Sequence, residues 1–148
     1  MTDRPALPTA AELQQTLLAS PYHRWLGLEV VEVHRDRIEL RAAPRDEWVG
    51  DPRTRTIHGG VLAGLLDLAA DWALVGAIGT GVPTVDLTIN YLRAAILGPL
   101  HVTGKLVRPG RQVSVAEAEV RDDGGRLLAV GRGSFLSAVA DPDATGGT

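Results

Sequence analysis

The chain has 148 residues, a formal net charge of -3 and no cysteine. This length predicts one domain able to bury a core without metal or disulfide support. The lack of cysteine excludes disulfides, thiolate metal sites and cysteine nucleophiles, and the charge argues against nucleic-acid binding. The N-terminus lacks a signal-peptide core, and the chain has no uncharged apolar run of 18 residues. We therefore expect a cytoplasmic protein without a membrane span.

The first 21 residues are expected to form an N-terminal segment with one short helix. Thr9 followed by Glu12 fits a capping box, and Pro21 ends the helix. An amphipathic turn around Tyr22 and Trp25 follows, and its aromatic side chains are interpreted as packing residues.

The rest of the chain alternates between strand patterns and turn residues, apart from one long apolar stretch. The expected strands are 28–34, 37–43, 84–91, 100–108, 112–121 and 126–136. A long polar loop is expected over 45–57, and a disordered tail over 141–148. A single domain would then span 22–140.

The long apolar stretch, 59–77, predicts a helix that is apolar almost all round. Such a helix is normally buried. The predicted fold class is therefore α+β, with one antiparallel sheet wrapped around a long central helix. The open edges of this sheet favour self-association by strand pairing.

One stripe of the predicted helix is unlike the others. At 100° per residue it carries Gly60, Ala63, Gly64, Asp67, Asp71 and Leu74. The opposite side carries Leu62, Leu65, Ala69, Trp72 and Gly76, which would fill the sheet. The small residues beside the carboxylates leave room for another backbone or a slender ligand. The alternative is that both carboxylates only point to solvent.

The helix start carries free amide groups and the positive end of the helix dipole. Gly59 and Gly60 there would let a carbonyl oxygen approach the bare amides, as in an oxyanion hole. The alternative is an ordinary helix entry capped by His58. Gly59 lies roughly 12 Å along the axis from Asp67, at 1.5 Å per residue. One helix cannot bring both to one carbonyl group, whereas two antiparallel helices across a two-fold axis can.

The remaining motifs do not indicate a function. The glycines of 76–81 lack the context of a dinucleotide loop, and Ser134 lies outside a nucleophile elbow. His23, His34 and His101 have no metal-ligand spacing. No metal or other cofactor is expected.

Several separated motifs together resemble one known family. They are Ile57-His-Gly-Gly60 with Asp67 nine residues after the histidine, Pro83–Arg93, Val107–Arg111 and Asp123–Ala129. This pattern is similar to hotdog-fold acyl-CoA thioesterases of the PaaI-like type, and the match covers about residues 22 to 138.

The resemblance implies thioester hydrolysis by a homodimer or a dimer of dimers, without a cofactor. By position, Gly59 would offer its N–H to the thioester carbonyl, and His58 would shape that turn. Asp67 of the other subunit would act as nucleophile or general base. Thr84 would help to position the water or the carboxylate.

The sequence departs from the family pattern at two positions. Pro52 stands where relatives commonly carry Asn or Gln, so Asp51, Arg53 or Thr54 takes over that role or the role is missing. Asp71 stands where some relatives carry a hydroxyl group. Two close carboxylates would raise the pKa of one, and we favour a structural or auxiliary role for Asp71 over proton transfer.

The expected substrate is a medium-chain or aromatic acyl-CoA lying along Gly60 and Asp71, beside Leu74. The coenzyme A phosphates would meet basic residues at the mouth, for which Arg93, Arg108 and Arg111 are candidates. The alternative for each is a solvated charge at a strand end. Two other functions stay open: a non-catalytic acyl-CoA-binding hotdog protein, and a hotdog enoyl-CoA hydratase or dehydratase.

Overall fold

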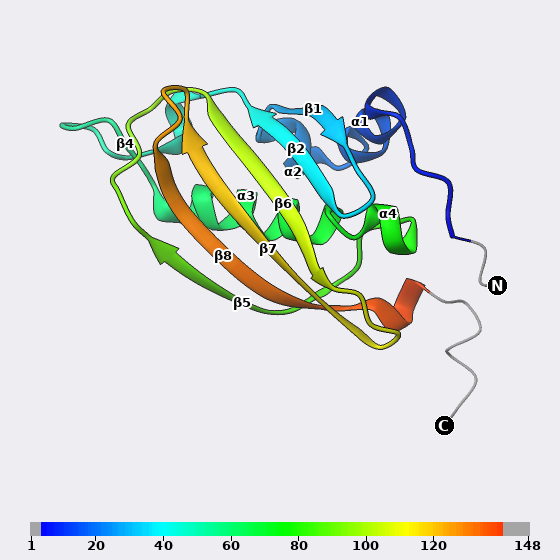
Figure 1. The fold of residues 1–148 in the computed structure, drawn as a ribbon. Coiled ribbons are helices and arrows are strands. Elements are labelled where there is room, and N and C mark those ends of the chain that lie inside the picture. Colours follow the sequence, from blue (N-terminus) through cyan, green and yellow to red (C-terminus); the bar gives the residue numbers. More distant parts are fainter. Residues whose placement is uncertain (1–3, 141–148) are drawn as a thin grey trace.

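A computed structural model describes residues 4–140 and places a curled antiparallel sheet around a central helix, α3 (Figure 1). The sheet has six strands in the order β1-β2-β6-β7-β8-β5. Their bounds are β1 Leu28–Val33, β2 Arg37–Ala42, β5 Thr84–Tyr91, β6 Leu100–Arg108, β7 Val113–Asp122 and β8 Leu127–Leu136. The predicted architecture is confirmed, and these bounds agree with the predicted strands to within one residue.

The helices and a small second sheet complete the fold. The helices are α1 Ala10–Leu18, α2 Pro21–Trp25, α3 Gly59–Trp72 and α4 Val75–Ile78, with 3-10 turns η1 Asp46–Trp48 and η2 Ser137–Ala140. Strands β3 (Val49–Asp51) and β4 (Thr56–Ile57) form a separate hairpin. The capping box of Thr9 and Glu12 is confirmed. The tail expected over 141–148 lies outside the described residues.

The core lies between α3 and the concave face of the sheet. The helix contributes large side chains such as Leu62, Leu65 and Leu66, all nearly or fully buried. The sheet has a small residue where the helix comes closest. A Cβ on Gly104 of β6 would collide with the backbone carbonyl of Ala69 in α3. The absence of a side chain there lets the helix lie directly on the sheet.

The central helix is interrupted, which corrects the prediction of one helix over 59–77. α3 is capped at Ala73, and α4 begins at Val75. A Cβ on Gly76 would overlap the backbone of Arg35, whose Nη1 donates to the Gly76 carbonyl at 3.3 Å. The β1–β2 turn thus packs closely against α4. Leu74 is fully buried, so its predicted place on the open stripe is wrong.

The polar loop predicted over 45–57 contains η1, β3 and β4. Trp48 anchors it, since the side chain is fully buried and its carbonyl accepts the His58 N–H at 2.7 Å. A large buried side chain and a backbone hydrogen bond therefore fix His58, the N-cap of α3.

The segment Gly59–Ile78 is long and apolar enough to cross a membrane by length and composition alone. Most of it is buried inside the protein, where α3 is the helix enclosed by the sheet (Figure 1). Its apolarity is explained by that position.

Candidate active site

One stripe of α3 remains open on the side away from the sheet. Ala63, Gly64, Asp67 and Asp71 are half-buried there, and Gly60 at the helix start is exposed. The helix residues between them are almost all buried. The predicted stripe is therefore correct except for Leu74.

Asp67 is paired with a hydroxyl from the strand that follows the helices. Thr84 Oγ1, at the first residue of β5, donates to Asp67 Oδ1 at 2.6 Å. A short bond of this kind to a charged acceptor is among the stronger ones. It fixes one carboxylate oxygen and leaves the other without a side-chain donor among the described residues.

A bulge in β5 turns Thr84 toward the helix. Simple alternation along the strand would place Thr84 with Asp86 on the outer face. The register shifts between these two residues, so Thr84 pairs with buried Phe135 while Asp86 pairs with Ser134. Asp86 Oδ1 accepts the Ser134 N–H at 3.0 Å, which stabilises the irregular pairing. Bulges often re-aim a side chain beside an active site.

Asp71 lies one helical turn after Asp67 and contacts the segment that leads into β5. Its Oδ1 accepts the Val82 N–H at 2.7 Å. Burial raises the pKa of Asp71 to about 7, the Val82 N–H opposes this shift, and the Asp67 carboxylate adds to it. Asp71 is thus a carboxyl group that carries a proton up to near-neutral pH.

The start of α3 combines a cap with a free amide. His58 is the N-cap, and its Nδ1 accepts the Gly60 N–H at 2.9 Å. The Gly59 N–H has no acceptor among the described residues, as is usual for the first helical residue. Tyr91 Oη donates to the Gly59 carbonyl at 3.0 Å, which holds the turn in place. The capping role of His58 is therefore present, and it leaves the Gly59 amide available.

The free amide and the paired carboxylate lie at different points of one rigid helix. Gly59 and Asp67 are both in α3, roughly 12 Å apart along its axis. A single protomer therefore does not bring them to one carbonyl group.

Tyr22 lies on the open stripe, which the interpretation as a packing residue missed. A Cβ on Gly64 would overlap the Tyr22 hydroxyl, so the phenol rests on this glycine. Burial and the nearby Asp67 carboxylate raise the pKa of Tyr22. The ring stacks on Trp25 at 6.3 Å between centroids, and the Arg45 guanidinium covers Trp25. A glycine three residues before the carboxylate was the available signal, but only the fold shows what fills its space.

The three arginines expected to bind phosphates do not converge within one chain. Arg93 lies beside Gly59 and Tyr91 in a shallow pocket, and its Nη1 donates to the Leu127 carbonyl at 2.9 Å. Arg108 is the last residue of β6, and Arg111 follows the strand. Through β7 and β8, Arg108 is in register with the start of β5 rather than with its end. Strand geometry of about 3.3 Å per residue places them near the opposite end of the sheet.

Asp51, Arg53 and Thr54, the candidates to replace the Asn or Gln side chain missing at Pro52, form contacts with their own neighbours. Arg53 forms an ion pair with Asp51 at 3.1 Å, and the Asp51 carboxylate also accepts the Arg53 N–H. Thr54 Oγ1 lies 2.7 Å from Thr56 Oγ1. These contacts hold the exposed β3–β4 turn around Pro52 together.

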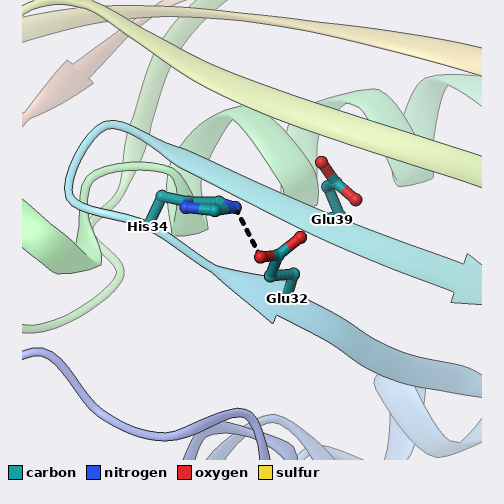
Figure 2. A group of neighbouring side chains, drawn as sticks. All are labelled: Glu32, His34 and Glu39. Carbon is teal, nitrogen blue, oxygen red and sulfur yellow. Dashed lines mark ion pairs between the residues drawn. The ribbon is translucent and has the colours of Figure 1, made fainter.

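Figure 2 shows a second group of polar side chains, Glu32, His34 and Glu39, on the β1–β2 hairpin. In the sequence, His34 has no metal-ligand spacing to another residue. In the fold, however, the hairpin places its Nε2 3.2 Å from the Glu32 carboxylate. Arg37 Nη2 lies 2.9 Å from the same nitrogen and 3.3 Å from Glu39. A guanidinium group therefore already holds the position that a cation would take.

Comparison with known proteins places this architecture in a family. A profile of the thioesterase superfamily matches residues 55–129. The medium/long-chain acyl-CoA thioesterase YigI of Salmonella typhimurium is 28% identical over 131 residues, covering 78% of this chain and 84% of its own.

Solved structures agree. One protein of the thioesterase superfamily, 38% identical, superposes with a TM-score of 0.80 over 82% of this chain and 92% of its own. The Escherichia coli PaaI protein has the same fold, with a TM-score of 0.75, 21% identity and coverage of 84% and 89%. The chain belongs to the thioesterase superfamily and has the hotdog fold. It is a thioester hydrolase.

Proposed function

We propose that the protein hydrolyses acyl-CoA thioesters at a site shared by two copies of the chain. The observation that carries this proposal is the pair of Asp67 and Thr84 on an open, glycine-lined helix face. The separate free amide at Gly59 supplies the second half of the site. We propose a medium-chain or aromatic acyl group as the one cleaved; in support, the relative YigI is a medium/long-chain acyl-CoA thioesterase.

The sharing follows from the helix geometry and from the sheet edge. Two antiparallel α3 helices related by a two-fold axis bring the Gly59 of one chain to the Asp67 of the other. The stripe permits this approach near the helix start, where Gly60 and Ala63 carry little or no side chain, while the Tyr22 phenol covers Gly64 farther along. The outer edge of β5 pairs with no strand in the described part of the chain, so β5 can extend the sheet into a partner.

The reaction needs a base, an oxyanion donor and a route for the proton. Asp67, oriented by Thr84, takes a proton from water as the water oxygen attacks the thioester carbon. The carbonyl oxygen gains negative charge, which the partner's Gly59 N–H stabilises. Collapse of the intermediate breaks the carbon–sulfur bond, and the leaving thiolate of coenzyme A takes the proton from Asp67. The products are the free acid and coenzyme A.

The phosphates of coenzyme A are proposed to lie near the start of α3, where Arg93 borders the pocket beside Gly59. Arg108 and Arg111 come from the other end of the sheet, so only a partner's copy can join Arg93. The acyl group follows the stripe and meets the Tyr22 ring over Gly64.

The test measures thiol release from a panel of straight-chain and aromatic acyl-CoAs. Asp67→Asn keeps an acceptor for Thr84 but cannot take a proton, so kcat should fall about 10³-fold or more with little change in binding. Asp123→Asn, on an exposed hairpin, is the matched control and should keep full activity. Full activity of Asp67→Asn contradicts the assignment.

Measurements of acyl-CoA binding and of enoyl-CoA hydration, made beside this assay, separate the other two functions. Acyl-CoA binding without thiol release by the wild type would indicate a binding protein. Hydration of an enoyl-CoA without thiol release would indicate a hydratase.

A further inference from the structure

The two carboxylates of the stripe contact the chain entering β5 as a matched pair. Asp67 accepts from Thr84, and Asp71 accepts from Val82. Four residues of helix rise about 6 Å, and two residues of extended chain span about 6.6 Å. The spacings match, so α3 and residues 82–84 run alongside each other through two hydrogen bonds.

The Asp71 contact fixes the position at which the chain joins β5. Val82 is buried, and a Cβ on Gly81 would lie only 2.7 Å from Asp71 Oδ2. Pro83 has no N–H to donate, so Val82 carries the last backbone donor before Thr84. The Asp71 carboxyl group is therefore the side chain that seats this segment on the helix.

We propose that Asp71 is a positioning residue of the thioesterase site: by holding Val82, it places the Thr84 hydroxyl against Asp67 and so orients the carboxylate that activates water. The proposal rests on the proposed function, because orientation of Asp67 matters only if Asp67 is the base. A displacement of about 1 Å at a reacting group can cost 10²-fold in rate.

Burial, together with the Asp67 carboxylate one turn earlier, raises the pKa of Asp71 to about 7, and the Val82 N–H opposes this shift. The Tyr22 phenol lies farther along the stripe over Gly64. A neutral carboxyl group still accepts from Val82 through its carbonyl oxygen. It also leaves Asp67 as the single charged carboxylate of the stripe.

The test compares Asp71→Asn with Asp71→Ala in the full-length enzyme. Asn keeps the acceptor for Val82, so kcat should stay within about 3-fold of wild type, whereas Ala should lower kcat about 10-fold or more with KM little changed. The wild-type kcat profile should show an inflection near pH 7 that Asp71→Asn lacks. Equal kcat values for wild type and Asp71→Ala, per folded enzyme, would overturn the proposal.

Amide hydrogen exchange supplies a second readout that does not depend on activity. Asp71→Ala should speed exchange at Val82 and Thr84 at least 10-fold, while Asp71→Asn should not. Unchanged exchange in Asp71→Ala would overturn the proposal even if the wild type is inactive. An inactive wild type with faster exchange in Asp71→Ala would instead contradict the proposed function alone and uphold the placement of Thr84 by Asp71.

Discussion

The two edges of the sheet are treated differently by the chain. At the β1 edge, α1 packs alongside, and the Gln14 side chain hydrogen-bonds to the open backbone groups of β1. Its Nε2 donates to the Leu28 carbonyl at 2.8 Å, and its Oε1 accepts the Val30 N–H at 2.6 Å. At the β5 edge the described residues provide no such cover, and Val85 and Tyr91 are exposed.

An open strand edge offers unpaired backbone groups, and proteins usually protect it. The chain protects one edge by itself with a single glutamine. The difference supports the proposal that β5, which also carries Thr84 and the bulge, pairs with a second copy of the chain. In that proposal, assembly and catalysis depend on the same strand.

The largest effect is expected from charging the open edge. Thr88→Asp combined with Asn90→Asp places like charges opposite one another in a dimer paired through β5. We expect dissociation at micromolar concentration and loss of most activity, because each site loses half of its residues. Sedimentation and turnover should change together. Val31→Asp, an exposed position on β1, is the control and should change neither; a fully active monomer of the β5 variant would refute the shared site.

The bulge of β5 should matter for the rate rather than for assembly. Asp86→Ala removes the acceptor for the Ser134 N–H, so the register can relax and Thr84 can turn outward. We expect kcat to fall about 10-fold with the dimer intact. Asp86→Asn retains an acceptor oxygen and should stay near wild type. Equal rates for the Ala and Asn variants would show that the bulge does not depend on this bond.

The pH dependence of stability should reflect Asp71. Its pKa is raised from 3.8 to about 7 in the folded protein, so the folded state keeps a proton that the unfolded chain loses. Stability should therefore fall between about pH 4 and pH 7 and level off above, by roughly 2–4 kcal/mol at most. Thermal unfolding of wild type and Asp71→Asn across this range measures the difference. Parallel curves for the two proteins would mean that Asp71 ionises normally.

The covered edge should show a smaller effect, confined to stability. Gln14→Ala leaves the Leu28 carbonyl and the Val30 N–H without their partners, which should cost about 1–3 kcal/mol. Denaturant unfolding should detect this loss, while the dimer and kcat stay unchanged. A loss of dimer in this variant would show that the β1 edge also takes part in assembly.

Most of the fold could be predicted because it follows from local patterns. Alternating strands, turn residues and the Thr9 capping box lie close together in sequence, and each specifies its element. The break between α3 and α4 could not be predicted, since no proline or glycine stands at Ala73. It accompanies the packing of Arg35 against Gly76, a contact distant in sequence.

The candidate site divides in the same way. Asp67 and the glycines of the stripe follow from helical spacing, and His58 follows from cap chemistry. The inward turn of Thr84 depends on a bulge between β5 and β8 that the Asp86–Ser134 bond supports, and alternation alone predicts the opposite face. Tyr22 and the Asp71–Val82 bond likewise join distant parts of the chain.

The central claim is that one site uses Asp67 of one chain and the Gly59 amide of the other. Gly59→Pro removes that amide, and proline is well tolerated at a first helical position after an extended N-cap such as His58. Asp67→Ala and Gly59→Pro dimers should each be inactive. A purified mixed dimer of the two, carrying a different tag on each chain, contains one intact shared site and should recover about half of the wild-type activity. A mixed dimer as inactive as its parents would contradict the account.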